Sequence, residues 1–435
     1  MAQIKPFAAL RFASSLPIDQ LTCQPYDVIS EQQQEQYYQQ HQNNMIRLEW
    51  GKKYPNDTET DNVYSRAAAT FAKWQQTGVL VQEEQPAFYV YIQEFTINGR
   101  QIRRTGFLTR LKACGYESGE VAPHEETLPG HKQDRLLLMQ ATYANFSPIF
   151  GLYAEPQRKI DQILAQAAYI PHRSADIDFI DAQQIRHLVY KVDEPPVLDQ
   201  VVKLMAGLKI YIADGHHRYE TASRFAAEIA PDQEEASYIM INLVNLFDPG
   251  LIVLPTHRIV RNVVDFSPEQ FFRRLRENHI RITAIQQNGT QENRDFLLNA
   301  MAKEDHNTAA IGLYLCGNYY LLQLAKNEPL LTKLLAEHSQ SYRELDVSIA
   351  HTMILESCCN IGMQEAASGH YISYTRSSQE AIDQVDEGNY QFALLLNNTK
   401  VDELLAVADA GEKMPQKSTF FYPKIIAGLT INKLK

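Results

Sequence analysis

The residues best suited to chemistry stand in the stretch LKIYIADGHHRYETA, from Leu208 to Ala222. Its centre, DGHHR at positions 214–218, places a carboxylate, two imidazoles and a guanidinium around one glycine. A glycine lets backbone approach an anion closely, and an arginine can hold that anion through two parallel hydrogen bonds. We therefore predict that this stretch binds a phosphate group. A turn whose histidines only cap the following helix is the alternative.

The residues around DGHHR predict the elements that position it. Apolar residues alternate with others from Leu208 to Ile212, which is the period of a half-buried strand. From Tyr219 to Ala226 they recur at helical spacing. The N-terminus of a helix directs unpaired N–H groups and a partial positive charge outward. The predicted anion therefore lies above a turn that joins a strand to a helix.

A second polar loop has the sequence HEET, between Pro123 and Pro129. Two adjacent carboxylates, Glu125 and Glu126, beside His124 suit general-base chemistry, and the helix expected next contributes Arg135 near an anion. An ordinary acidic surface loop has the same composition. The spacing of the histidines does not match the HExxH zinc signature.

Three further segments contain candidate binding residues. His257 and Arg258 close an extended run at 251–260 and could converge on the same anion, or could be a polar strand end. The accessory candidates on turns are Tyr26, Asp27, Lys417, Ser418 and Thr419. A lysine beside hydroxyls can bind phosphate, but no glycine-rich loop precedes Lys417, so this is not a Walker A motif.

Composition limits the class of protein. A chain of 435 residues exceeds the usual size of one core, so two or three domains are expected. The net charge of -11 argues against a broad nucleic-acid surface. Five cysteines without a CxxC pair indicate reduced thiols. The residues MAQIKPFAALRF lack the apolar run of a signal peptide, and no stretch has bilayer length, so we expect neither a signal peptide nor a membrane span. We expect a soluble, cytoplasmic protein without a membrane partner.

Periodicity predicts several elements away from these motifs. The expected strands are at 44–50 (NMIRLEW) and 236–246, and the expected amphipathic helix is at 64–76. The expected hairpins are at 87–111, turning at Asn98-Gly99, and at 309–324, turning at Gly317-Asn318. A β-α-β pattern is expected between residues 371 and 398.

Residues 105–260, approximately, resemble the ParB/sulfiredoxin-like fold and, within it, the free-serine kinases. The resemblance lies in the order of the motifs, in which HEET and DR precede a strand, DGHHRYETA and a helix. The whole chain is similar to the bacterial domain-of-unknown-function family ten-fifteen, in which PYDVIS, HEET with DR, DGHHRYETA, PTHR and PQKSTFFYPK recur in this order. The resemblance implies an α/β (α+β) fold. Its parts would be an N-terminal region (1–104), a ParB/sulfiredoxin-like phosphate-binding core (105–262) and a C-terminal α/β region (263–435).

The kinase resemblance also implies roles for individual residues. The resemblance places Gly215, His217 and Arg218 on the phosphate-binding turn. The further residues that we expect to bind phosphate or nucleotide are Tyr219, Thr221, Arg135, His257 and Arg258. The implied catalytic residues are Glu125, with Glu126 as the neighbouring alternative, Asp214 and His216. Glu125 would take the proton of a serine hydroxyl, while Asp214 and His216 would contact the transferring phosphoryl group or its metal. The implied cofactors are ATP or ADP with Mg²⁺, and Asp214 is the candidate magnesium ligand.

Three classes of function follow from these motifs. The favoured one is phosphotransfer between a nucleotide and a small hydroxyl metabolite, with free L-serine or O-phosphoserine as substrate and either direction open. The flanking regions would then supply a lid or a homodimer surface. A ParB-like DNA-binding or regulatory protein would need a basic helix-turn-helix after the core, where strands and helices alternate instead. A metal-dependent hydrolase would use His124, His216, His217 and His257, but their spacing fits no familiar metal site.

Overall fold

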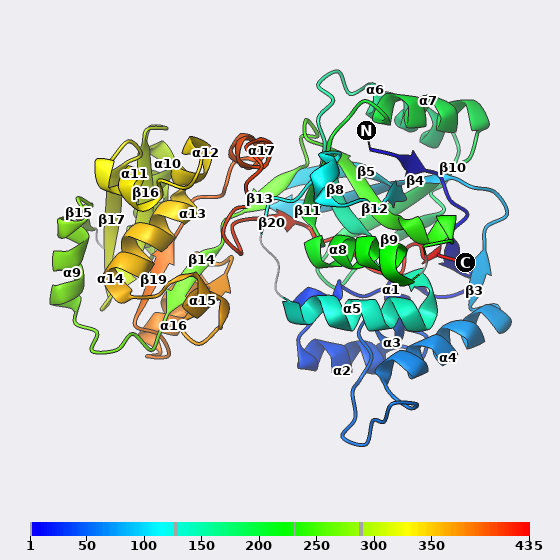
Figure 1. The fold of residues 1–435 in the computed structure, drawn as a ribbon, viewed down its shortest axis with the longest axis horizontal. Helices are drawn as coiled ribbons and strands as arrows, with labels where there is room; N and C mark the ends of the chain where they lie inside the picture. Colours follow the sequence, from blue (N-terminus) through cyan, green and yellow to red (C-terminus); the bar gives the residue numbers. More distant parts are fainter. Residues whose placement is uncertain (1, 126–128, 230, 287–289) are drawn as a thin grey trace. The chain divides into compact units, whose positions relative to one another are not determined.

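The computed structural model describes residues 2–125, 129–229, 231–286 and 290–435. They form two compact units (Figure 1). Unit 1 comprises Met1–Pro123, Thr127–Ile252 and Phe421–Lys435, and unit 2 comprises His124–Glu126 and Val253–Phe420. Each unit contains both helices and a β-sheet, so the predicted mixed α/β class is confirmed. The predicted division into regions 1–104, 105–262 and 263–435 stays a prediction.

Unit 1 is built on a nine-stranded sheet with the order β6-β11-β8-β12-β5-β4-β10-β9, in which β1 pairs with β5. The nine strands are β1 (Ile4–Lys5), β4 (Phe88–Ile97), β5 (Arg100–Lys112), β6 (Val121–Ala122), β8 (Ile149–Tyr153), β9 (Ile177–Ile180), β10 (Arg186–Val192), β11 (Ile210–Asp214) and β12 (Tyr238–Asn245). The predicted hairpin at 87–111 is confirmed as β4 and β5. Asn98 and Gly99 have φ values of 50° and 75°, as a tight hairpin turn requires. The strand predicted at 236–246 is confirmed as β12, which is buried along its whole length.

The helices of unit 1 pack around this sheet. They are α1 (Ile18–Leu21), α2 (Glu31–Gln40), α3 (Ile46–Glu49), α4 (Val63–Gln76), α5 (Pro129–Thr142), α6 (Lys159–Ala168), α7 (Pro195–Met205) and α8 (His216–Arg224), with the 3₁₀ turn η1 (Tyr26–Val28). The main core joins buried residues of α5 to α8 to those of the central strands, and α5 lies beside α8 (Figure 1). The helix predicted at 64–76 is confirmed as α4. Two short strand pairs, β2 (Leu10–Phe12) with β3 (Leu80–Gln82) and β7 (Ala144–Asn145) with β21 (Asn432–Lys433), complete the unit.

The strand predicted at 44–50 is wrong, because Ile46–Glu49 form helix α3. Asn44 starts this helix: its side-chain oxygen accepts from the N–H of Ile46, and its amide donates to the carbonyl oxygens of residues 20 and 22. The side chains of Ile46, Leu48 and Glu49 are all buried, including the charged one. A short helix that is buried on most sides can therefore show apolar residues at alternate positions. The period of the sequence does not distinguish such a helix from a strand.

Unit 2 contains a six-stranded sheet, in which all neighbouring strands are antiparallel. In spatial order the strands are β15 (Arg281–Ile285), β17 (Asn318–Ala325), β16 (Thr308–Leu315), β19 (Phe392–Leu395), β14 (His257–Val260) and β18 (Ile372–Thr375). The predicted β-α-β pattern is confirmed as β18, α16 (Ser378–Asp386) and β19, with β14 inserted between the two strands. The second hairpin is also confirmed. Its turn lies one residue earlier than predicted, at Cys316 and Gly317, where φ is 49° and 73°.

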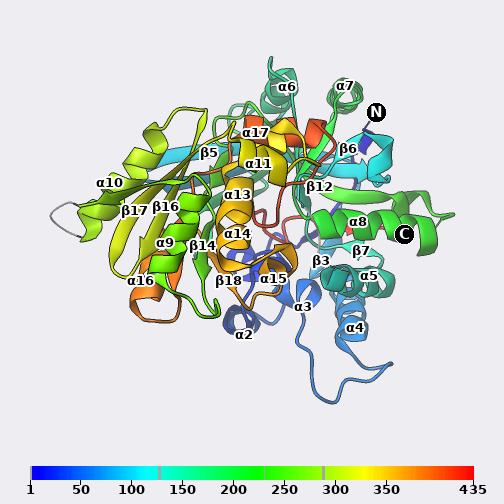
Figure 2. The same cartoon turned by 60° about the vertical axis from the view of Figure 1, so that its left-hand side comes forward.

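Helices cover both faces of this second sheet. Helix α10 (Thr290–Lys303) and α16 share a core with the side chains of one face. On the other face, Phe271 of α9 (Pro268–Glu277) contacts Phe392 of β19 with ring centroids 5.0 Å apart, and Figure 2 shows α9 alongside α14. The remaining elements are α11 (Pro329–Leu334), α12 (Gln340–Arg343), α13 (Asp346–Ile349), the π-helix η5 (Ala350–Glu356), α14 (Ser357–Cys359), α15 (Met363–Ala367) and α17 (Val401–Asp409). Strands β13 (Ile252–Leu254) and β20 (Phe420–Tyr422) form a separate pair.

Two general properties follow from the described part of the chain. None of its helices combines the length and the apolar character that spanning a bilayer requires. Its five cysteines, Cys23, Cys114, Cys316, Cys358 and Cys359, are free thiols.

Candidate functional site

The DGHHR stretch of unit 1 has the geometry that its sequence predicts. Strand β11 ends at Asp214, and helix α8 begins at His216. Gly215 between them has φ +89° and ψ +29°. A Cβ atom at this position would lie 2.7 Å from a side-chain carbon of Ile149 and 2.9 Å from a guanidinium nitrogen of Arg218. Only glycine therefore fits here without strain, and the amino end of α8 opens directly onto the turn.

Two cations face the carboxylate of Asp214. The Nζ atom of Lys424 lies 3.2 Å from Oδ2 of Asp214, and Nη2 of Arg218 lies 3.9 Å from the same oxygen. Burial opposes ionisation of this carboxyl, but the charges of Lys424 and Arg218 outweigh it and hold the pKa of Asp214 well below its usual range. The turn therefore combines one negative and two positive charges, which leaves an excess of positive charge beside the helix N-terminus.

Lys424 is positioned by polar side chains of the central sheet. Gln93 of β4 donates a hydrogen bond of 2.9 Å to the carbonyl oxygen of Lys424. The fully buried guanidinium of Arg104, on β5, donates to the carbonyl oxygens of Tyr422 and Pro423. These bonds fix the C-terminal segment of unit 1 so that the lysine reaches the DGHHR turn.

Arg218 is held from beneath the turn by a chain of hydrogen bonds. Its Nη1 atom donates to the carbonyl oxygen of Pro148 at 2.6 Å and to Oγ of Ser147 at 3.2 Å. The Ser147 hydroxyl in turn donates to Oε1 of Glu49 at 2.7 Å. The Nε atom of Arg218 is buried and has no hydrogen-bond partner among the described residues. The guanidinium thus has a fixed orientation and an unused donor, as an anion-binding arginine requires.

Two other predicted residues join this network. Arg135 of α5 donates to the carbonyl oxygen of Glu49 at 2.8 Å, and its guanidinium carbon lies 4.2 Å from the ring centroid of Tyr26. Glu49, Arg135, Ser147 and Arg218 line one cavity of about 30 Å³, large enough for a water molecule. Burial raises the pKa of Tyr26 far above its usual value, so its hydroxyl stays neutral. The structure therefore places Tyr26, Arg135 and Arg218 in one polar cluster.

The other predicted residues of this region have separate environments. His216 is buried and His217 is half-buried, and both make contacts of their own. The Tyr219 hydroxyl donates to the carbonyl oxygen of Cys114 at 2.8 Å, within the main core. Thr221 is buried and Asp27 is exposed. Phosphate contacts for these residues stay predictions.

The candidate base lies in unit 2, where a C-terminal segment holds it. Oε1 of Glu125 accepts hydrogen bonds from the backbone N–H and the hydroxyl of Thr419, both at 2.9 Å. Because that hydroxyl donates its only proton to Glu125, it accepts from Nε2 of His124, 2.8 Å away. The N–H of Met414 also donates to the carbonyl oxygen of His124 at 2.7 Å. The structure thus unites His124, Glu125 and Thr419, whereas Glu126 lies outside the described residues.

The remaining predicted residues also belong to unit 2. Arg258 of β14 is buried and donates to the carbonyl oxygen of Lys417 at 3.5 Å. His257 is in the core, where Nδ1 accepts from the N–H of Leu396 at 3.1 Å, and burial lowers its pKa to about 4. The Ser418 hydroxyl donates to the carbonyl oxygen of Pro415, while the side chain of Lys417 is exposed.

The predicted site residues are therefore shared between two units. The DGHHR turn, Arg135 and Tyr26 belong to unit 1, and Glu125, Arg258 and Thr419 belong to unit 2. Their convergence on one ligand stays a prediction. No three His, Cys, Asp or Glu side chains of the described residues come together as metal ligands. Asp214 is a single carboxylate that pairs with Lys424, and its role as a magnesium ligand stays a prediction.

Sequence reasoning missed three residues of the turn's surroundings: Glu49, Ser147 and Lys424. Glu49 lies in the segment wrongly predicted as a strand, and Ser147 has no signal of its own. Lys424 ends the motif PQKSTFFYPK, where only its first polar residues were considered. The position of that lysine within a quoted motif was the one signal that could have identified it.

The link between Glu49 and Ser147 can be tested by its effect on stability. We expect Ser147→Ala to lower the free energy of unfolding by about 1 kcal/mol, because it leaves the buried oxygen of Glu49 without its donor. Thermal and denaturant unfolding would measure this loss. The control is Glu35→Gln on α2, which breaks an ion pair with Lys52 at the surface. It should leave the unfolding transition unchanged. Equal transitions in wild type and Ser147→Ala would contradict the assigned network.

A comparison with known proteins identifies the family. The family model described as "Protein of unknown function (DUF1015)" matches residues 4–348. The chain therefore belongs to this family, and the resemblance predicted from its motifs is confirmed. No curated protein matches the sequence.

Several solved structures are similar to parts of this chain. A conserved hypothetical protein from Pyrococcus furiosus is 12% identical, covers 71% of this chain and 89% of its own length, and has a TM-score of 0.33. A free serine kinase mutant in complex with ADP is 10% identical, covers 72% and 89% of the two chains, and has a TM-score of 0.36. C-terminally truncated SbnI from Staphylococcus aureus is 12% identical, covers 75% and 87%, and has a TM-score of 0.34.

Proposed function

We propose that this protein is a nucleotide-dependent phosphotransferase that acts on a small hydroxyl metabolite, with free L-serine and O-phosphoserine as the first substrate pair to test. The observation that carries the proposal is the DGHHR turn. Its glycine, the amino end of α8, and two cations facing one carboxylate form a cradle for phosphate oxygens. Phosphoryl transfer depends mainly on such positioning and charge neutralisation.

The proposed roles follow from the contacts of each residue. Arg218 and Lys424 would bind nucleotide phosphates, since the first has an unused buried donor and the second carries a compact positive charge beside the turn. Asp214 would keep both cations in place, because its carboxylate stays ionised between them. ATP or ADP is the proposed phosphate donor or acceptor. Mg²⁺ would neutralise charge on the nucleotide phosphates.

Glu125 is the proposed general base. Thr419 fixes the position of its carboxylate through two hydrogen bonds to one oxygen. In the forward direction, the acceptor hydroxyl oxygen bonds to the terminal phosphorus, the bond from that phosphorus to the bridging oxygen of the nucleotide breaks, and Glu125 takes the hydroxyl proton. In the reverse direction, the protonated carboxyl returns the proton to the serine oxygen.

A product analysis tests this proposal. The protein is incubated with Mg²⁺ and either L-serine plus ATP or ADP, or O-phosphoserine alone or with ADP or AMP, and the amino acid is then identified by mass spectrometry. We expect interconversion of serine and O-phosphoserine with at least one nucleotide. Release of phosphate from O-phosphoserine without nucleotide would instead indicate a phosphatase. Absence of any change in all mixtures would reject serine as the substrate.

A further inference from the structure

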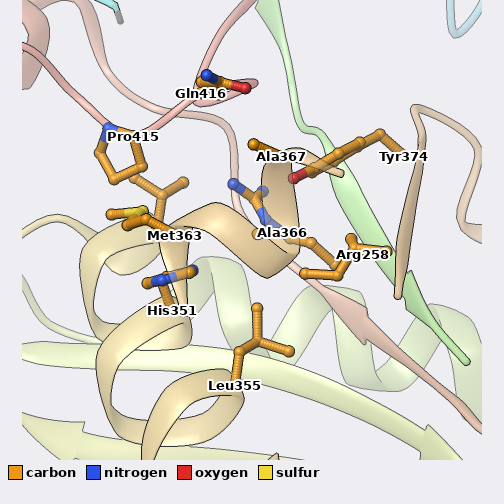
Figure 3. A pocket seen from close by; sticks show the side chains of 11 residues that line it. Arg258, His351, Leu355, Met363, Ala366, Ala367, Tyr374, Pro415 and Gln416 are labelled. Carbon is orange, nitrogen blue, oxygen red and sulfur yellow. The ribbon is translucent and has the colours of Figure 1, made fainter. Parts of the chain in front are cut away.

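Unit 2 contains a second polar pocket, and one of its lining residues is Arg258, which the sequence predicts as a candidate phosphate-binding residue. Figure 3 shows the side chains that line it, which come from β14, α13, η5, α15, β18 and the segment before Lys417. Its polar residues are Arg258, His351 and Tyr374. Its walls are apolar and include Leu355, Met363 and Ala366. The volume of about 30 Å³ has room for roughly two water molecules, which is close to the size of a single carboxylate group.

Arg258 brings a buried positive charge to this pocket. The residue is 5% exposed, and burial lowers its pKa, while the Tyr374 hydroxyl and the charge of Glu125 oppose this lowering without cancelling it. Among the described residues, its guanidinium donates to the carbonyl oxygens of Thr256 and Lys417, and it lies 5.7 Å from the ring centroid of Tyr374. No ion pair joins Arg258 to a carboxylate in the part of the chain that the structure describes. Burial of a guanidinium away from water is costly, and an anion that binds beside it lowers that cost.

His351 adds a buried hydrogen-bonding atom without a partner. The residue is 6% exposed, and its Nε2 atom is fully buried with no hydrogen-bond partner among the described residues. Burial and the nearby charge of Arg258 lower its pKa to about 4, so its ring is neutral near pH 7. A neutral imidazole offers one N–H donor without adding a second charge. An unsatisfied buried polar atom is costly, and a ligand oxygen would remove that cost.

The composition of the pocket restricts the ligand that fits. One full positive charge, one neutral donor and one tyrosine hydroxyl match a monoanion with two oxygen atoms. A phosphate dianion would find only half of its charge neutralised, and the apolar walls favour a group attached to carbon. We propose that this pocket binds the carboxylate of a small organic acid, with Arg258 as counter-charge and His351 as hydrogen-bond donor.

The pocket is connected to the candidate base through one short segment. Pro415 and Gln416 line the pocket, the carbonyl oxygen of Lys417 accepts from Arg258, and Thr419 binds Glu125. An acid anchored at Arg258 would therefore present the rest of its carbon skeleton on the same unit as Glu125. The identification of this acid as the phosphoryl acceptor rests on the proposed function, whereas its binding does not.

Ligand binding without nucleotide tests the inference directly. Isothermal titration calorimetry on the full chain would compare L-serine, L-lactate and D-glycerate with L-serinamide and L-lactamide, and inorganic phosphate would be a further probe. We expect at least one acid to bind at millimolar concentration and its amide to bind about tenfold more weakly or not at all. Arg258→Met should weaken acid binding about 100-fold, and His351→Phe about tenfold.

Controls distinguish the outcomes. Arg276→Met changes an exposed arginine of α9 in the same unit and should leave acid binding unchanged. If Arg258→Met fails to fold, His351→Phe and the comparison of acids with amides still test whether the pocket binds a carboxylate. Three outcomes would overturn the inference. Acids and amides could bind equally, no acid could bind at all, or inorganic phosphate could bind more tightly than the acids and lose its binding in the same variants. Acid binding without nucleotide-dependent turnover would reject the proposed function alone. Turnover with an unchanged KM for the acid in Arg258→Met would reject the pocket alone.

Discussion

Replacement of Glu125 by glutamine is expected to lower kcat about 1,000-fold while the nucleotide Kd stays nearly unchanged. Glutamine keeps the size of the side chain and an oxygen that can accept from Thr419, but it cannot take a proton from the acceptor hydroxyl. The proposed nucleotide-binding residues of unit 1 remain intact. Steady-state rates of serine–phosphoserine interconversion and calorimetric titration with ADP would measure the two effects separately.

Two companion variants make this prediction specific. Glu337→Gln alters an exposed carboxylate of the same unit and should retain wild-type turnover. Glu126→Gln tests the neighbouring carboxylate, which is the alternative base. If Glu125→Gln and Glu126→Gln both retain full activity, the assignment of the base to this loop is wrong.

Replacement of Arg218 by alanine is expected to raise the Kd for ADP about 100-fold, with a smaller effect on kcat at saturating nucleotide. The change removes a positive charge beside Asp214. It also removes the Nε–H donor of Arg218, which has no hydrogen-bond partner among the described residues. It also removes the bonds to Ser147 and Pro148, so the melting temperature should fall as well. Calorimetric titration and thermal unfolding would be measured on the same preparation.

The conservative variant separates charge from geometry at this position. Arg218→Lys retains the charge but loses the planar fork, and we expect it to recover only part of the affinity. Arg224→Ala, an exposed change on the same helix, should bind ADP like wild type. Wild-type affinity in a folded Arg218→Ala protein would exclude the DGHHR turn as the phosphate site.

The elements of this protein were predictable where local patterns decide them. Alternation and the Asp-Gly pair placed β11, the turn at Gly215 and α8, because a strand, a positive-φ glycine and an amphipathic helix are each specified within a few residues. The hairpin of β4 and β5 was predictable for the same reason, through Asn98 and Gly99. The segment at 44–50 was not, since a short helix buried on most sides has no amphipathic period.

The candidate site was predictable only in part. Motifs identified Asp214, Arg218 and Glu125 as polar residues in suitable loops. They did not identify Lys424, Glu49 or His351, which have no local pattern. Lys424 reaches Asp214 only because Arg104 and Gln93 of the sheet bind its segment. Glu49 of α3 reaches Arg218 through Ser147, which lies between β7 and β8.

The sequence by itself determined the family, the mixed α/β class and the turn that offers a phosphate cradle, because these depend on periodicity, on glycine stereochemistry and on motifs read along the chain. The tertiary structure alone decided which cations face Asp214, that Thr419 holds Glu125, and that Arg258 and His351 share an enclosed pocket. Those features depend on distances between residues far apart in sequence and on how far each charge is removed from water. Long-range packing sets both quantities.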